Sequence, residues 1–262
     1  MINNRIALIG LGWLGMPLAQ ELQSKGYRLT VSSRNKEKLT YIEAQGWMPL
    51  NFNSITSPNL SEDNEGFLKN VKHLIITLPP STFKENTSQL KILLEKFDPN
   101  CQVIFTSSTG IYLNENNVYD ETSAVDTSSL LGVLEQEIKD RSHYCILRLA
   151  GLIGPKRHPV KYLLPKETRE NGNAVVNLVH QNDVIQAIIS CISEEKNQII
   201  YNVCYPDHPT KAEYYNKASQ FYYQKKMTFK SGEKGKIILG KKIEKERKFK
   251  YSHKITDFGY LI

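Results

Sequence analysis

Apolar residues follow two alternating patterns through the first part of the chain. Short runs that are apolar throughout predict buried strands near residues 5–10, 27–34, 47–51, 71–80, 101–108 and 143–151. Apolar positions three and four residues apart predict helices at 16–26, 36–45, 82–97 and 127–140. The polar stretch at 53–70 is expected to cross the surface. Because continuously apolar strands alternate with helices, we predict a parallel sheet covered by helices on both faces.

Beyond about residue 152 the pattern is less regular. It predicts a strand at 174–179, a helix at 182–194, a strand at 199–204 and a helix at 210–223. The predicted fold class is therefore α/β, a Rossmann-type doubly wound parallel sheet with a small α+β C-terminal annex. We expect a nucleotide-binding domain at 1–155, to which 174–194 also contribute. A substrate-side annex should follow at 156–224, and then a basic, partly mobile tail at 225–262.

The composition is typical of a soluble globular protein. Of the 262 residues, 40% are hydrophobic and 23% are charged, and no apolar run approaches the roughly 18 residues of a membrane helix. No secretory signal is recognisable in MINNRIALIG, so we expect a cytoplasmic protein. Four widely separated cysteines, each in or beside an apolar segment, predict buried thiols rather than a metal site.

The positive charge is confined to one end of the chain. The formal net charge is +7, yet residues 225–254 hold twelve Lys or Arg against three Glu, which leaves 22 basic and 24 acidic residues elsewhere. Glutamates are interleaved with these lysines, which is typical of a solvated helix or arm. We therefore expect a small-molecule substrate, and neither a nucleic acid nor a membrane as partner. A homodimer is compatible with this composition.

A glycine motif follows the first predicted strand directly. Residues 10–15, GLGWLG, have the G-x-G-x-x-G spacing and open the first predicted helix. Gly10 permits the tight turn, Gly12 lets a pyrophosphate approach the backbone, and Gly15 lets the helix lie close to the strand. The free N–H groups at the helix start then face the phosphates. The whole loop, including Trp13 and Leu14, is predicted to bind a dinucleotide.

The end of the second strand indicates which dinucleotide. An NAD site usually has a carboxylate there for the ribose 2′-hydroxyl, but this strand ends in VSSRN. Arg34 can pair with a 2′-phosphate and Ser33 can donate a hydrogen bond to it, which favours NADP and leaves NAD as the alternative. Leu78, Pro79 and Pro80, at the carboxyl end of the fourth strand, are expected beside the ribose and pyrophosphate.

Later motifs resemble a known superfamily. Residues 104–112 (IFTSSTGIY) and 120–123 (DETS) resemble the short-chain dehydrogenases/reductases, in particular the extended, NAD-dependent epimerase/dehydratase branch. Residues 147–155 (LRLAGLIGP) and 178–184 (LVHQNDV) are similar to the branch's loop near the nicotinamide and its later turn into a helix. The resemblance covers roughly residues 1–225. It implies that the cofactor is also bordered by Thr106, Ser107, Ala150 and Gly151.

Two functional groups of that superfamily are missing. Its members share proton transfer among a serine at the end of the fifth strand, a tyrosine, and a lysine four residues after the tyrosine. Ser108 matches the serine, but the tyrosine position falls on Ser129 and the lysine position on Val133. A phenol needs a neighbouring ammonium to bring its pKa towards working pH, and a serine beside a valine has no such help. The chain is therefore expected to be an atypical member.

Four other residues are candidates for the site. Tyr112, just after Ser108, is either an acid that faces a substrate or a buried aromatic side chain. Arg157 and His158 lie in a loop where Arg157 could bind an anionic substrate and His158 could transfer a proton; the alternative is a solvated loop. His180 is either a substrate-binding residue of the cleft or a structural histidine. We assign catalytic roles to Ser108, Tyr112 and His158 and substrate binding to Arg157 and His180.

Three functions fit these observations. The first is an NAD(P)-dependent oxidoreductase or epimerase-like enzyme that acts on a small or sugar-type substrate with a non-standard acid and base. The second is a catalytically inactive NADP-binding sensor or regulator. The third starts from the β-hydroxyacid dehydrogenases, which share an opening similar to GLGWLGM with Arg34 downstream. These enzymes continue into a long all-helical domain, whereas strands are predicted here after residue 100.

Overall fold

The computed structural model describes residues 4–56, 68–165, 167–193 and 197–261. Most of the polar stretch predicted to cross the surface lies outside these ranges. No helix within them is both long enough and apolar enough to cross a membrane.

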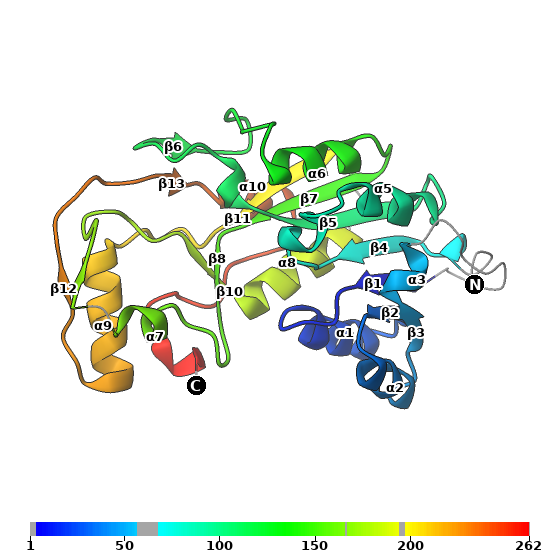
Figure 1. Cartoon of the computed structure of the whole chain (residues 1–262), viewed down its shortest axis with the longest axis horizontal. Coiled ribbons are helices and arrows are strands. Elements are labelled where there is room, and N and C mark those ends of the chain that lie inside the picture. Colours follow the sequence, from blue (N-terminus) through cyan, green and yellow to red (C-terminus); the bar gives the residue numbers. More distant parts are fainter. Residues whose placement is uncertain (1–3, 57–67, 166, 194–196, 262) are drawn as a thin grey trace. The chain divides into compact units, whose positions relative to one another are not determined.

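Seven strands form the main sheet, in the order β11-β7-β5-β4-β1-β2-β3 (Figure 1). They are β1 (Arg5–Ile9), β2 (Arg28–Ser33), β3 (Met48–Asn51), β4 (His73–Ile76), β5 (Gln102–Ser108), β7 (Tyr144–Leu149) and β11 (Ile199–Val203). β1 pairs in parallel with β2 and β4, β2 pairs in parallel with β3, and β4 with β5. The predicted Rossmann-type fold is therefore confirmed. The strand at 199–203, predicted for the annex, is instead the edge strand of this sheet.

Helices connect these strands, and the apolar spacing predicts all of them except the short α3. They are α1 (Gly15–Ser24), α2 (Lys36–Ala44), α3 (Phe52–Ile55), α5 (Ser88–Glu95), α6 (Leu130–Lys139) and α8 (Gln181–Ser193). The helix predicted at 82–97 begins only at Ser88, because a separate 3₁₀ turn, η1 (Pro80–Phe83), comes first. The Asn86 side chain then accepts a hydrogen bond from Ser88 N at 3.1 Å.

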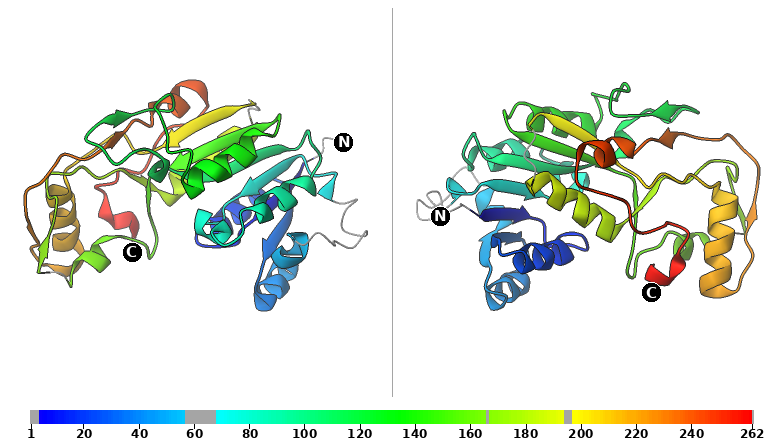
Figure 2. Two further views of the ribbon diagram at one scale, coloured as in Figure 1. Left: turned by 45° about the horizontal axis from the view of Figure 1, so that its top comes forward. Right: turned by 180° about the vertical axis from the view of Figure 1, so that it is seen from behind.

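Alternate residues of the central strand face opposite sides of the sheet. Ala7 and Ile9 belong to a buried cluster with Leu90, Leu93 and Leu134 of α5 and α6. Ile6 and Leu8 are fully buried and point to the other side, because successive side chains of a strand alternate. Figure 2 shows α5 and α6 on one face of the sheet and α1 on the other. Burial on both faces is the reason that these strands are apolar throughout.

The chain divides into two compact units. The first comprises residues 1–107, 127–147 and 191–200, and the second comprises 108–126, 148–190 and 201–262. The second unit contains three short parallel strand pairs. Its elements are η2 (Thr109–Ile111), β6 (Val118–Tyr119), β8 (Gly151–Ile153), α7 (Val160–Leu163), β9 (Thr168–Arg169), β10 (Leu178–His180), α9 (Lys211–Tyr223), β12 (Thr228–Phe229), β13 (Ile237–Ile238), α10 (Lys241–Glu246) and η3 (Phe258–Leu261).

The basic C-terminal segment belongs to the second unit. β13 pairs with β6, and Ile238, Ile243, Phe249 and Ile255 are buried among the exposed lysines. Long charged side chains surround these apolar residues, so the run of charge conceals an apolar pattern in the sequence. The predicted limits of domain, annex and tail stay predictions.

Candidate functional site

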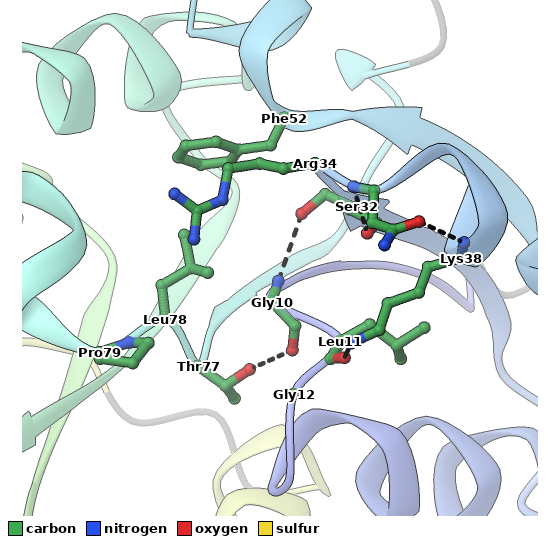
Figure 3. Close-up of a pocket in the computed structure, with 12 residues that line it drawn as sticks. Gly10, Leu11, Gly12, Ser32, Arg34, Lys38, Phe52, Thr77, Leu78 and Pro79 are labelled. Carbon is green, nitrogen blue, oxygen red and sulfur yellow. Dashed lines mark hydrogen bonds between the residues drawn. The ribbon is translucent and has the colours of Figure 1, made fainter.

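The first unit holds a pocket where β1, β2 and β4 end (Figure 3). Its volume is about 290 Å³. It is lined by Gly10, Leu11, Gly12, Ser32, Ser33, Arg34, Asn35, Lys38, Phe52, Thr77, Leu78 and Pro79. Open α/β sheets bind ligands at the carboxyl ends of their parallel strands. The pocket therefore lies where a nucleotide is expected, and it brings together six of the residues predicted for the cofactor.

Glycines shape the turn between β1 and α1. Gly10 has a φ of +112°, a left-handed conformation that favours glycine. A Cβ at Gly15 would overlap the carbonyl oxygen of Gly10, so only glycine lets α1 begin this close to the strand. A Cβ at Gly12 would meet nothing within 4 Å. Gly12 thus borders open space, through which a ligand can approach the backbone.

Two hydroxyls and an ammonium hold this turn. Gly10 N donates a hydrogen bond to Ser32 Oγ at 3.2 Å, and Thr77 Oγ1 donates to Gly10 O at 2.8 Å. Lys38 of α2 donates from Nζ to Leu11 O at 3.2 Å. The motif spacing predicts none of these three residues. A hydroxyl within a buried strand could have indicated Ser32, because a buried polar group needs a hydrogen-bond partner.

The start of α1 is suited to an anion. No side chain caps its first N–H groups, and its first turn contains no acidic residue. The partial positive charge at the start of this ten-residue helix is therefore not neutralised by a carboxylate of the helix itself. Met16 N already donates to Gly12 O at 3.0 Å and Pro17 has no N–H group, so the N–H groups that could bind a phosphate oxygen are those before Met16.

The charged residues of the pocket are both cations. Arg34 and Lys38 line it, and no Asp or Glu is among its lining residues. Figure 3 shows the Arg34 side chain reaching from the end of β2 towards the wall that Leu78 and Pro79 form. Ser33 Oγ accepts a hydrogen bond from Asn35 N at 3.1 Å, which fixes the turn that follows β2. The cavity therefore selects for a negatively charged ligand.

The remaining residues predicted for the cofactor lie outside the lining of this pocket. Leu14 is the N-cap residue of α1, Trp13 precedes it, and Pro80 opens η1. Thr106 Oγ1 donates to Ile76 O at 3.1 Å, and Ser107 Oγ donates to Glu135 Oε1 at 2.7 Å. These two hydroxyls thus hold β5 to β4 and to α6.

Ala150 and Gly151 lie in the second unit. Ala150 N donates to Val203 O, and Gly151 N donates to Asn177 O, each at 3.0 Å. A Cβ at Gly151 would lie 2.8 Å from Leu178 Cδ2, so β8 and β10 approach closely at this glycine.

Ser108 and Tyr112 differ sharply in accessibility. Ser108 is half-buried and caps η2, where its Oγ accepts a hydrogen bond from Gly110 N at 3.1 Å. Tyr112 is only 2% exposed. Its hydroxyl donates to Asn202 Oδ1 at 2.8 Å and accepts from Arg148 at 2.9 Å. Burial raises the pKa of Tyr112 and outweighs the opposing effect of the Arg148 charge. This phenol is therefore neutral and fully engaged.

His158 is also engaged at both ring nitrogens. Nε2 lies 2.9 Å from the Tyr214 hydroxyl, and Nδ1 accepts a hydrogen bond from Val160 N at 3.2 Å. The rings of Tyr214, Tyr222 and Phe258 surround it, with the Tyr214 ring stacked at 5.6 Å. Burial lowers the pKa of His158 to about 4. The imidazole is neutral near pH 7 and forms part of a wall, whereas the neighbouring Arg157 is exposed.

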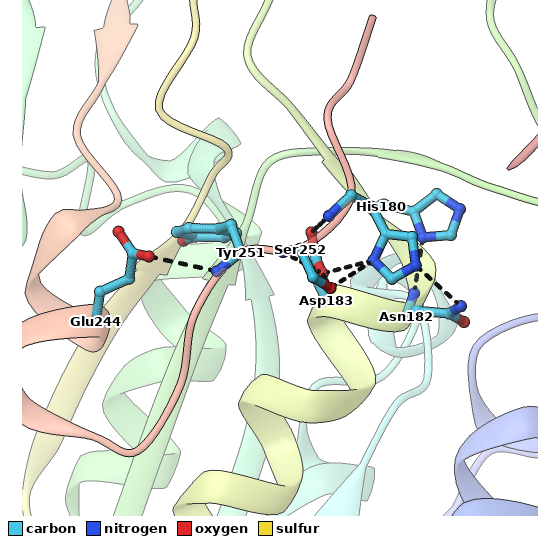
Figure 4. A network of polar contacts seen from close by, with 7 residues as sticks. His180, Asn182, Asp183, Glu244, Tyr251 and Ser252 are labelled. Atoms are coloured by element: carbon cyan, nitrogen blue, oxygen red, sulfur yellow. Dashed lines mark hydrogen bonds and ion pairs between the residues drawn. The ribbon is translucent and has the colours of Figure 1, made fainter. Parts of the chain in front are cut away.

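His180 lies in a polar network that joins α8 to the C-terminal segment (Figure 4). Its ring stacks on that of His253 at 4.3 Å, and its Nδ1 accepts from Asn182 N at 3.2 Å. Burial lowers the pKa of His180 to about 4. The buried Asp183 carboxylate accepts hydrogen bonds from the backbone and side chain of both Ser252 and His253, with His253 Nδ1 at 2.8 Å. The sequence motifs predict neither His253 nor this junction.

Ser129 and Val133, at the positions of the missing pair, both lie on α6. Ser129 is its N-cap, and its Oγ accepts a hydrogen bond from Gly132 N at 3.1 Å. Val133 is 38% exposed. Among the described residues, no group of three or more His, Cys, Asp or Glu side chains could hold a metal ion. The four cysteines are buried, as predicted, and none of them is part of a disulfide.

A known family matches the N-terminal part of the chain. Residues 5–130 match the NAD binding domain of 6-phosphogluconate dehydrogenase. The match ends before β7, and β7 and β11 continue the same sheet. A long all-helical domain therefore does not follow residue 100, and the interpretation as a β-hydroxyacid dehydrogenase is wrong.

One relative and several solved structures span almost the whole chain. Protein YeeZ of Escherichia coli K12 is 32% identical over 264 residues, which cover 95% of this chain and 96% of that protein. UDP-N-acetylglucosamine 4-epimerase from Bacillus cereus has a TM-score of 0.74 at 14% identity, covering 96% and 95% of the two chains. UDP-glucuronic acid 4-epimerase of the same species, in complex with NAD, has a TM-score of 0.72 at 15% identity, covering 97% and 93%. At these identities the structures show a common fold, which is the fold that the resemblance to the epimerase/dehydratase branch implies.

Proposed function

The chain belongs to the family of Protein YeeZ, and from this premise we propose that it is an NADP-dependent oxidoreductase or epimerase-like enzyme of an atypical short-chain dehydrogenase/reductase type. Its NAD-binding Rossmann domain supports the cofactor class. The observation that carries the preference for NADP is the pocket at the glycine turn, which Arg34 and Lys38 line without any carboxylate.

The residues of this pocket fit a dinucleotide. Gly12 borders open space, and the uncapped N–H groups of α1 can receive the pyrophosphate. The guanidinium of Arg34 can hold a 2′-phosphate with two parallel hydrogen bonds. Leu78 and Pro79 would border the ribose. When bound, the nicotinamide would supply or accept a hydride.

We assign the substrate oxygen to Ser108, whose half-buried hydroxyl caps a short turn at the end of β5. Proton transfer must then come from a group other than a tyrosine and lysine on α6, where Ser129 and Val133 stand. Tyr112 and His158 remain candidates only if substrate binding frees them from their present hydrogen bonds. A water molecule held by Ser108 is the third candidate.

The coenzyme preference is tested by binding measurements. We expect the wild-type chain to bind NADPH more tightly than NADH in isothermal titration calorimetry. Arg34→Ala should weaken the binding of NADPH by about 10- to 100-fold, because charge-assisted hydrogen bonds to the 2′-phosphate are lost. The affinity for NADH should stay nearly unchanged. Arg28→Ala, an exposed arginine on the same strand outside the pocket, is the control. A wild-type preference for NADH would refute NADP as the coenzyme.

An inactive NADP sensor is the second candidate. It is favoured by the engagement of the groups predicted for proton transfer: Tyr112 and His158 are held by hydrogen bonds, and Ser129, at the tyrosine position, caps α6. A sensor needs coenzyme affinity but no acid or base. It would respond to NADP by a change in conformation that a partner recognises.

Turnover separates the two candidates. An enzyme should oxidise NADPH with some member of a panel of aldehydes, ketones and sugar carbonyls, and Ser108→Ala should lower the rate without changing the Kd of NADPH. Ser142→Ala, at an exposed serine, is the control. Tight NADPH binding without turnover on the whole panel would favour the sensor.

A further inference from the structure

A second cavity lies within the second unit, where α7 and the end of α9 lie side by side (Figure 1). Its volume is about 350 Å³, within the range of small-molecule pockets. The residues that line it are Lys156, Arg157, His158, Val160, Lys161, Tyr162, Tyr222 and Tyr223. None of them lines the nucleotide pocket.

Every charged side chain in this lining is positive. Lys156, Arg157 and Lys161 contribute three cations, and the lining contains no Asp or Glu. His158 adds no charge near pH 7, because burial holds its pKa at about 4. Three like charges around one small cavity repel each other, and an anion between them removes that repulsion. The charge of the lining therefore selects an anionic ligand.

Tyrosine rings form the rest of the wall. Tyr222 is held in place because its hydroxyl donates to Phe258 O at 2.7 Å and its ring contacts His158 at 5.6 Å. Tyr162 is 77% exposed and Tyr223 is 40% exposed, unusual values for large aromatic side chains. Exposed rings beside cations can stack on a planar group while the cations hold its charge.

A tight turn presents the cations. Gly154 N donates to Arg157 O at 3.1 Å, and Arg157 N donates to Gly154 O at 2.9 Å, which closes the turn. Lys156, inside it, has a φ of +60°, a conformation that favours glycine and is sparsely populated by lysine. A lysine kept in this conformation has a fixed backbone from which its side chain starts. Lys156 and Arg157 therefore extend from a hydrogen-bonded turn, whereas Lys161 extends from α7.

We propose that this cavity is a binding site for an anionic small molecule with a planar ring, of the chemical class of aromatic phosphate esters. The three cations bind the phosphate, and Tyr162, Tyr222 and Tyr223 border the ring. The inference goes beyond the proposed function, because occupancy of this site requires neither hydride transfer nor a bound dinucleotide.

Phenyl phosphate is the probe, titrated into the full-length protein at low salt by calorimetry. We expect it to bind more tightly than inorganic phosphate, which lacks the ring, and than phenol, which lacks the charge. The affinity should fall as salt is raised. The same titration with Arg34→Ala should give an unchanged affinity, so that a failure of the NADP assignment is distinguishable from a failure here.

Variants map the site. Lys156→Gln and Lys161→Gln should each weaken phenyl phosphate by about three-fold, typical of exposed charge pairs, and the double variant by about ten-fold. Lys245→Gln, at an exposed lysine of α10, is the charge-matched control. Tyr162→Ala should weaken binding by about three-fold or more, whereas Tyr162→Phe should keep it. All four side chains are exposed, so thermal unfolding should show folded variants.

One carboxylate gives a test of opposite sign. Asp257 directly precedes Phe258, whose carbonyl oxygen accepts the hydrogen bond of Tyr222 at 2.7 Å, and so lies near the wall of the cavity. Asp257→Asn removes a negative charge and should tighten phenyl phosphate binding. The proposal is overturned if phenyl phosphate does not bind, if inorganic phosphate binds as well as it does, or if the two lysine variants bind like the wild type.

Discussion

At the scale of single residues, the three glycines of the nucleotide turn have different reasons to be glycine. Gly10 needs its positive φ, and Gly15 has no room for a side chain because the carbonyl oxygen of Gly10 is in the way. Gly12 has neither constraint, because a Cβ there would point into open space. The first and third glycines are thus required by folding, whereas the second is required only if a ligand occupies the pocket.

Alanine at two of these glycines separates folding from binding. Gly15→Ala should lower the free energy of unfolding by about 1–3 kcal/mol, the usual effect of overpacking. Gly12→Ala should leave it within about 0.5 kcal/mol and weaken NADPH by ten-fold or more, since the new methyl would obstruct the pyrophosphate. Urea unfolding and calorimetry measure the two effects. Full NADPH affinity in a folded Gly12→Ala protein would contradict the placement of the cofactor.

The buried histidines predict a pH dependence of stability. His158 has a pKa of about 4 in the folded protein and an ordinary value of 6.5 when unfolded. The unfolded chain therefore binds a proton that the folded protein excludes between these values. The contribution of neutral His158 to the free energy of unfolding should be fully present above pH 6.5. It should fall by about 2–3 kcal/mol as the pH drops towards 4.

Urea unfolding at several pH values tests this dependence. His158→Gln should be less stable at pH 7 because it loses the bond to Tyr214, yet its stability should fall less steeply between pH 6.5 and 4. His180 and His208, whose pKa values are also lowered by burial, contribute to the slope that remains. An unchanged slope in His158→Gln would show that this ring titrates normally in the folded state.

At the scale of elements, α6 shows how a helix can keep its packing role without catalytic side chains. Leu134 and Ile138 are fully buried against the α5 side of the sheet, and Glu135 is bonded to Ser107 of β5. Ser129 caps the helix instead of contributing a phenol. Ser129 and Glu135 each have a structural partner, which agrees with an acid and base located elsewhere in the chain.

Ser129→Ala tests this structural role. Loss of an N-cap hydroxyl should lower the free energy of unfolding by about 1 kcal/mol. Ser129→Asp should restore the cap, because aspartate is an equally good N-cap residue. NADPH affinity and any turnover should stay at the wild-type level in both variants. A loss of rate in Ser129→Ala at unchanged stability would instead give this hydroxyl a chemical role.

At the scale of the whole molecule, the C-terminal segment is an integral part of the second unit. It supplies β13 and α10, and Ser252 and His253 surround the carboxylate of Asp183 (Figure 4). The Asp183 side chain is 1% exposed, so little water can compete for the hydrogen bonds that its carboxylate accepts from the segment. The buried carboxylate of Asp183 therefore holds the C-terminal segment in place, although the surface of this segment is strongly basic.

Removal of that anion should release the segment. Asp183→Ala leaves the donors of Ser252 and His253 without their acceptor and should cost about 3 kcal/mol of stability. Trypsin should then cleave faster at Lys248, Lys250 and Lys254, identified by mass spectrometry of the fragments. Asp207→Asn, an exposed carboxylate in the same unit, should change neither property. Equal cleavage rates in Asp183→Ala and the wild type would mean that other contacts hold the segment.

Local features of the sequence determined the fold class, most elements and the nucleotide turn. Burial on both faces makes parallel strands apolar throughout, and a glycine turn needs its glycines whatever the rest of the chain does. Arg34, adjacent to the strand end, could be assigned to the pocket for the same reason. These signals lie within a few neighbouring residues, so they can be read without tertiary contacts.

Only the tertiary structure decided the places where distant segments meet. Thr77 is far from the glycine turn along the chain, His253 is 70 residues from Asp183, and Tyr222 joins the loop of Lys156 only through the packing of α7 and α9. The burial and hydrogen bonding of Tyr112 and His158 could likewise not be predicted from the sequence, because their partners are residues far along the chain. A sequence pattern shows which chemical groups each residue can contribute, whereas the fold determines which of these groups come into contact.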